Sequence, residues 1–188
     1  ANGLLSSVRA IATASASAQN ISGGRWVDLT HPFNEQSIYW PTADTFKKTL
    51  VFKGFTKGGW FYAAYNYSAA EHGGTHMDSP IHFAEKANTA DQVPISQLIA
   101  PGYVIDVSAQ SAEDADYRVS AADIEAFEAK HGQIPAGAIV LLNTNRARFY
   151  PDRKAYMGTD ERGQDAVAKL HFPGLSQEGA APVSYTHL

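Results

Sequence analysis

Residues 71–83, with the sequence EHGGTHMDSPIHF, constrain the fold more than any other part of the chain. Two adjacent glycines, the β-branched Thr75 and Pro80 interrupt this stretch, and all of them disfavour a helix. His72 and His76 are four residues apart and would share a face only in a helix, so the sequence predicts a glycine-rich turn instead. The fold must therefore hold an ordered loop at this point.

Four side chains of the metal-binding type lie in this loop: His72, His76, Asp78 and His82. A tight turn lets two imidazoles converge on one point, and residues two apart share a face where the chain is extended. Two imidazoles and one carboxylate suit a catalytic site, which leaves room for water. The loop thus predicts one divalent ion on His72, His76 and Asp78, with His82 near the open position. The alternative is a polar turn whose histidines only form hydrogen bonds.

Composition limits the class of protein. The chain has 188 residues, of which 44% are hydrophobic, enough to bury the core of one globular domain. Its net charge is -4, and its Lys and Arg residues are scattered, so neither nucleic acid nor a membrane is an expected partner. The chain has no cysteine, which leaves histidine and carboxylate as the strong metal ligands. This ligand set suits zinc or manganese.

The pattern of apolar residues predicts strands joined by a few helices. Five runs rich in β-branched or aromatic residues are expected to form strands, at 26–30, 49–55, 60–68, 103–108 and 138–144. Ser120, with Asp123 three residues on, predicts the start of a helix that Gly132 ends, and a short helical turn is expected at 95–99. The sequence therefore predicts a single mixed α/β domain, rich in strands, with the histidine loop leaving the strand that ends near Ser68.

The two ends of the chain differ from its middle. Residues 1–24 are rich in Ala and Ser, and we interpret them as a leader or the remnant of a secretory signal peptide. A signal peptide would imply a periplasmic or secreted protein, and its absence a cytoplasmic one. Residues 182–188 resemble a translated sequencing adaptor, so we expect a folded domain at 25–180 and a natural chain that continues beyond it.

The stretch HGGTHMDSPIHF resembles the signature HxGTHxDxPxHF of the metal-dependent cyclase family of hydrolases, which includes kynurenine formamidases and isatin hydrolases. DLTHP, LLNTN and HFPGLS resemble further segments of that family, so the likeness covers roughly 26–179. Asn143 and Asn145 depart from the usual LLRTG pattern. The resemblance implies a swivelling β/β/α fold with a β-barrel-like core, assembled as a homodimer or homotetramer whose neighbouring subunits help to complete the pocket.

The resemblance also implies roles for the loop residues. His72, His76 and Asp78 match the family's metal ligands, and His82 matches a histidine that binds a second ion or acts beside the first. The family has a later His and Glu that the given residues lack, so we expect this chain to be an incomplete enzyme.

The expected reaction is the hydrolysis of an amide by metal-activated water. A divalent ion lowers the pKa of bound water from about 15.7 to about 7 and polarises the carbonyl. His82 is a candidate general acid and base. We expect an aryl formamide such as N-formylkynurenine as the substrate, with the cyclic amide of isatin as the alternative. A metal-binding protein without catalysis is an alternative of another class.

Aromatic side chains upstream of the loop suit a small aromatic substrate, although half of them are expected in the core: Tyr39, Trp40, Trp60, Phe61, Tyr62 and Tyr65. Tyr39 and Trp40 lie beside Pro41 in a predicted loop, and these two are our candidates for substrate contact. His31 either lies near the site or holds its own loop in place.

Overall fold

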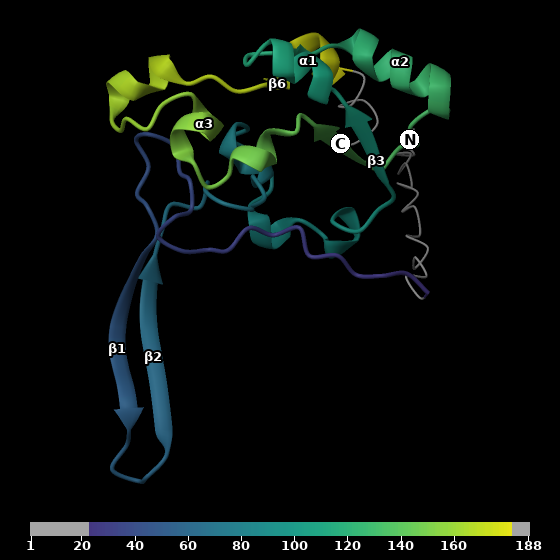
Figure 1. The fold of residues 1–188 in the computed structure, drawn as a ribbon. Helices are drawn as coiled ribbons and strands as arrows, with labels where there is room; N and C mark the ends of the chain where they lie inside the picture. The colour runs from purple at the N-terminus through teal and green to yellow at the C-terminus, as the bar shows by residue number, and fades with distance from the viewer. Residues whose placement is uncertain (1–22, 182–188) are drawn as a thin grey trace, which may run out of the picture.

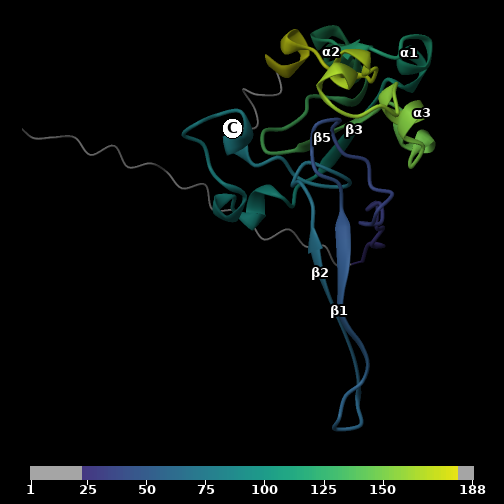
Figure 2. The same cartoon turned by 90° about the vertical axis from the view of Figure 1, so that its left-hand side faces the viewer.

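A long hairpin is the most extended feature of the structure. The structure is a computed structural model and describes residues 23–181. The strands of the hairpin, β1 (Lys47–Phe55) and β2 (Phe61–Ser68), pair antiparallel, with a shift in register between Leu50 and Phe52. The hairpin projects away from the other elements in both views (Figures 1 and 2). Its β-branched and aromatic residues favour pairing, and Gly59 at φ +85° allows the chain to reverse.

A parallel pair of strands supports the body of the molecule. β3 (Gly102–Asp106) pairs with β5 (Ile139–Asn143). Parallel strands need a crossover connection, and here the chain passes through α1 (Ser108–Glu113) and α2 (Ala121–His131). The buried core gathers side chains from β3, α2 and the connections around them: Ile105, Val107, Val119, Ile124, Ile134 and Ala138.

Short elements complete the described chain. β4 (Arg118–Val119) and β6 (Gly174–Leu175) form a second parallel pair, and α3 (Arg153–Met157) follows β5. The 3-10 helices are Pro80–His82, Ala90–Gln92, Ile95–Gln97, Arg146–Phe149 and Gln164–Lys169. Within residues 23–181, none of the helices has the length and apolar character needed to cross a membrane.

Most of the predicted elements are confirmed. The strands expected at 49–55, 60–68, 103–108 and 138–144 correspond to β1, β2, β3 and β5, with ends that differ by at most two residues. α2 begins after Ser120, whose hydroxyl accepts the N–H of Asp123, and Gly132 follows it at φ +91°. The helical turn expected at 95–99 is a 3-10 helix.

The strand predicted at 26–30 is wrong. The N–H of Thr30 donates to Asp28 Oδ1 over 2.9 Å, a local bond in place of a strand ladder. Trp26 and Leu29 are 83% and 81% exposed, and no described residue pairs with this segment as a strand. A strand is stable only when its backbone forms hydrogen bonds to a neighbouring strand. The apolar residues of this segment gave no information about such a neighbour.

The mixed α/β class is confirmed, whereas a closed barrel is not found: the strands of residues 23–181 form three separate two-stranded sheets. The leader up to residue 22 and the tail at 182–188 lie outside the described residues. The expectation that half of the six upstream aromatic side chains are in the core is also wrong. Only Tyr39 is buried, and the other five are at least 40% exposed; four of these, Trp60, Phe61, Tyr62 and Tyr65, lie on the projecting hairpin.

Candidate metal centre

The loop that follows β2 is shaped by its glycines. Gly73 forms an isolated antiparallel bridge with Tyr39, and Gly74 has a φ of +65°. A Cβ atom on Gly73 would lie 2.1 Å from Cε1 of Tyr39, so only glycine lets the backbone approach this ring. No helix forms here before Pro80, which confirms the predicted turn.

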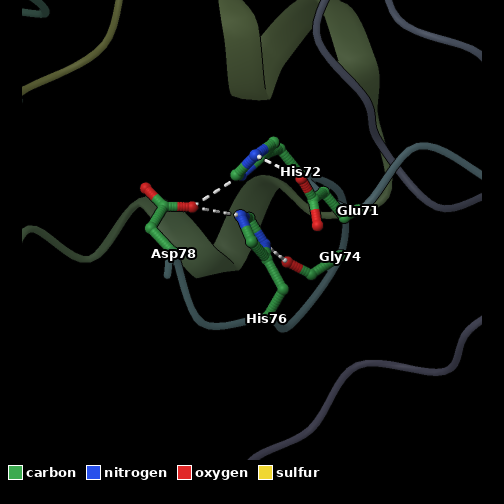
Figure 3. A network of polar contacts seen from close by, with 5 residues as sticks. All are labelled: Glu71, His72, Gly74, His76 and Asp78. Atoms are coloured by element: carbon green, nitrogen blue, oxygen red, sulfur yellow. Dashed lines mark hydrogen bonds and ion pairs between the residues drawn. The ribbon is translucent and has the colours of Figure 1, made fainter. Parts of the chain in front are cut away.

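The side chains of His72 and His76 meet at one oxygen of Asp78 (Figure 3). Its Oδ1 lies 2.7 Å from Nδ1 of His72 and 3.1 Å from Nε2 of His76. His82, at the end of the 3-10 helix Pro80–His82, stacks on His72 with ring centroids 3.7 Å apart. One ligand-type atom each from His72, Asp78 and His82 lie within 4.8 Å of one another. The structure thus brings the four residues together: His72, Asp78 and His82 form one possible group of ligands, and His76 joins it through Asp78.

The ring of His76 is oriented by the backbone. Its Nδ1 lies 3.0 Å from the carbonyl oxygen of Gly74, and a carbonyl only accepts, so this nitrogen carries a proton. In a neutral ring Nε2 is then an acceptor, yet it faces the carboxylate of Asp78. Two acceptors at this distance need a proton or a metal cation between them. Metal-binding histidines commonly donate their other N–H in this way.

Charge in the cluster also suits a cation. Partial burial raises the pKa of Asp78, but the hydrogen bond from His72 and the charges of His72, His76 and His82 outweigh burial, so the pKa lies below its usual value. Sequence reasoning missed Glu71, whose Oε1 lies 3.5 Å from Nε2 of His72 (Figure 3). His72 therefore lies between two carboxylates, and Glu71 had no signal beyond its position next to a ligand.

His31 braces the loop from the preceding segment. Its backbone N–H donates to Oγ1 of Thr75 over 3.0 Å. Its ring stacks on Tyr150 with centroids 4.0 Å apart, and it does not join the four clustered side chains. His31 therefore contacts the metal loop through its backbone and lies beside the site.

The two candidates for substrate contact have different surroundings. Tyr39 is 1% exposed, and its hydroxyl has no hydrogen-bond partner among the described residues. Burial and then the nearby Tyr150 raise its pKa above the usual value. Trp40 instead lines a cavity of about 300 Å³. None of the four clustered residues lines that cavity, so contact of Tyr39 and Trp40 with a substrate stays a prediction.

Comparisons with known proteins agree with the geometry. Residues 27–183 match the Cyclase family, described as "Putative cyclase". An isatin hydrolase of Roseibium aggregatum is 36% identical over 118 residues, which cover 60% of this chain and 43% of that protein. A kynurenine formamidase of Bacillus anthracis is 27% identical over 84 residues, covering 45% of this chain and 39% of that protein.

Solved structures show the same likeness. The crystal structure of an isatin hydrolase bound to the product analogue thioisatinate has a TM-score of 0.71 and 28% identity, and the match covers 86% of this chain and 63% of that one. The chain therefore spans less than two thirds of the length of each of these proteins.

Proposed function

This chain belongs to the Cyclase family, and we propose that it is a metal-dependent hydrolase of aryl amides. The observation that carries the proposal is the meeting of His72 and His76 at one oxygen of Asp78, with His82 stacked beside them. The predicted resemblance of the loop to this family is confirmed. Relatives that are amide hydrolases support the reaction class.

The substrate within this class follows from the relatives. The isatin hydrolase matches more of this chain at higher identity than the kynurenine formamidase does, which favours a cyclic aryl amide of the isatin type. An aryl formamide of the N-formylkynurenine type, the substrate first expected from the sequence, is the second candidate. In both, the leaving nitrogen is attached to an aromatic ring, which makes it a better leaving group than an alkyl amine.

Each clustered side chain has a task in this reaction. His72, His76 and Asp78 would hold zinc or manganese, and the Gly74 carbonyl keeps Nε2 of His76 turned toward Asp78. When bound, such an ion lowers the pKa of water to about 7 and polarises the amide carbonyl. His82 accepts the proton of the attacking water and returns it to the departing nitrogen.

Metal removal and restoration test the proposal. We expect a chelator to abolish hydrolysis of isatin and of an aryl formamide, and added zinc or manganese to restore it. The measurements are metal content by elemental analysis and product formation by absorbance. Stoichiometric metal binding with neither substrate hydrolysed would instead favour the metal-binding protein without catalysis.

The hairpin also supports a proposal for assembly, a homodimer in which it contacts a second copy of the chain. Phe55 and Trp60, at its tip, are 76% and 63% exposed, and an isolated two-stranded hairpin is marginally stable in water. Residues 47–68 contain four of the fifteen Lys and Arg residues and none of the nineteen Asp and Glu residues, which leaves eleven basic against nineteen acidic elsewhere. A basic, apolar arm suits the acidic remainder of a second copy. We propose the swivelling fold with its barrel-like core together with this assembly, from the likeness to the Cyclase family.

A further inference from the structure

We propose that the cavity lined by Trp40, Arg146 and Phe172 binds a planar aromatic carboxylate, at a site separate from the metal cluster. The cavity has a volume of about 300 Å³, within the range of small-molecule sites. Its three principal residues come from distant parts of the chain. Arg146 and Phe172 have no part in the proposed hydrolysis, whereas Trp40 is also a predicted substrate contact. Two features of the cavity suit such a ligand: its aromatic walls, and the guanidinium group of Arg146, which has no acidic partner in the described chain.

The walls suit a flat ring. The rings of Trp40 and Phe172 meet edge to face, with centroids 6.2 Å apart and planes at 78°. Trp40 is 40% exposed, so part of its indole ring is not covered by protein. Tyr156 and Met157 extend the lining. Aromatic side chains arranged in this way bind a planar ring by stacking and edge contacts.

Arg146 supplies a positive charge without an acidic partner. Its Nε and Nη2 donate to the carbonyl oxygen of Tyr156 over 3.2 and 2.9 Å, and Nη2 also donates to that of His171 over 2.5 Å. These neutral acceptors fix the plane of the guanidinium. No carboxylate of the described chain forms an ion pair with Arg146, and Asp116 instead pairs with Nδ1 of His171 over 2.7 Å.

The remaining nitrogen of Arg146 is the point of recognition. Nη1 makes no hydrogen bond to any residue in the described range, and it is not among the buried unpartnered atoms. Its two N–H groups are therefore available to a ligand. A carboxylate on an aromatic ring lying against Trp40 and Phe172 in the cavity would supply the missing negative charge, and charged hydrogen bonds of this kind are stronger than neutral ones.

The test compares two ligands of the same shape. Calorimetric titration of metal-free protein with benzoate and with benzamide separates charge from ring contact. We expect benzoate to bind at least about tenfold more tightly, because a hydrogen bond to a charged group is worth about 1.5–3 kcal/mol and 1.4 kcal/mol is tenfold in affinity. Equal affinities for the two ligands would overturn the proposal.

Variants then assign the site. Arg146→Gln should weaken benzoate binding about tenfold or more while leaving benzamide binding unchanged, and Trp40→Leu should weaken both. Arg148→Gln is the matched control, because Arg148 lies in the same 3-10 helix and, like Arg146, over the ring of Phe149, but it does not line the cavity. A loss with Arg148→Gln equal to that with Arg146→Gln would contradict the assignment. Arg146 also holds two backbone carbonyls, so Arg146→Lys, which keeps the charge, should retain part of the benzoate affinity.

The metal separates this inference from the proposed function. Trp40 follows Tyr39, which bridges to Gly73 in the metal loop, so the titrations are repeated with zinc bound. Benzoate binding that requires zinc and ignores Arg146→Gln would place the carboxylate on the metal and overturn the inference, while leaving the hydrolase proposal intact. Benzoate binding that depends on Arg146, in a protein that binds no metal, would support this inference and contradict the hydrolase proposal.

Discussion

A single backbone contact orients His76 and makes it the most informative residue to change. Its Nδ1–H donates to Gly74, so Nε2 has no role in the described structure except toward Asp78. We expect His76→Ala to lower metal affinity by more than the roughly 10–100-fold that loss of an outer-shell partner costs. Elemental analysis after dialysis against a mild chelator measures the effect. His131→Ala, on α2, is the control and should retain metal.

His82 differs from His76 because its ring stacks on that of His72 and one of its nitrogens lies within 4.8 Å of ligand atoms of both His72 and Asp78. We expect His82→Ala to lower turnover by about 100- to 10,000-fold, the usual contribution of a general acid or base, with a smaller loss of metal affinity. Steady-state kinetics and metal titration on the same sample separate the two quantities. Equal losses of turnover and of metal affinity would show that His82 is a primary ligand. Unchanged turnover would show that its role is structural.

Gly73 and Tyr39 form the bridge that holds the start of the metal loop. Gly73→Ala should destabilise the fold by about 1–3 kcal/mol, because its new methyl group would overlap the Tyr39 ring, as in other overpacked sites. Tyr39→Phe should be neutral or slightly stabilising, since it removes a buried hydroxyl without a partner among the described residues. Urea unfolding of both variants tests this contrast. A large loss with Tyr39→Phe would mean that the hydroxyl has a partner, such as a buried water.

Among the elements, α2 has an N-terminus whose stability depends on pH. Burial raises the pKa of Asp123, but bonds from the Ser120 backbone, the Ser120 hydroxyl and Tyr117 outweigh burial, so the folded pKa lies below the usual value. Such a group adds stability above its unfolded pKa of about 3.9, and this stability is lost as pH falls through the lower folded pKa. We expect Asp123→Asn to lower the free energy of unfolding by about 1 kcal/mol at pH 7.

The difference between Asp123→Asn and the unchanged protein should shrink as the pH falls below about 4, because the carboxyl group becomes neutral in both states. Urea unfolding at a series of pH values follows it. Ser120→Ala serves as a comparison, since it removes the cap but keeps the carboxyl group. A difference that stays constant with pH would contradict the role of the ionised side chain.

Elements with local signals were predictable from the sequence, and elements that depend on distant partners were not. The cap residue Ser120 and the ending Gly132 are near neighbours of α2, so the sequence located that helix closely. β4 and β6 have two residues each, too few for a periodic pattern, and α1 begins without a side-chain cap. The segment at 26–30 has strand-like composition but no described partner.

The same division holds for the sites. The metal loop is contiguous, so residue types and spacing were sufficient to propose its ligands. The aromatic cavity joins Trp40, Arg146 and Phe172, which are far apart in the chain, and no local pattern relates them. The carbonyls that orient Arg146, those of Tyr156 and His171, belong to the backbone and have no signature in the sequence.

At the scale of the whole molecule, the basic hairpin and the acidic remainder of the chain lead to the last prediction, a dimer whose affinity depends on salt. Exposed aromatic residues on an arm with unpaired strand edges are also a surface that natural proteins usually cover. We expect the mass in solution, measured by light scattering, to correspond to at least two chains at low salt. Raising the salt should weaken the assembly, because screening reduces the attraction between opposite charges.

Variants of the hairpin test the same contact. Trp60→Ser should raise the dissociation constant by about 30-fold or more if Trp60 is a central contact, since such residues contribute about 2 kcal/mol or more. Lys53→Glu should weaken association at low salt and have less effect at high salt. Trp26→Ser is the matched control, because Trp26 is even more exposed than Trp60 but lies outside the hairpin. A monomer at every salt concentration, with a hairpin that instead binds anionic lipid vesicles, would show that its basic and aromatic side chains serve a membrane surface and would rule out the dimer.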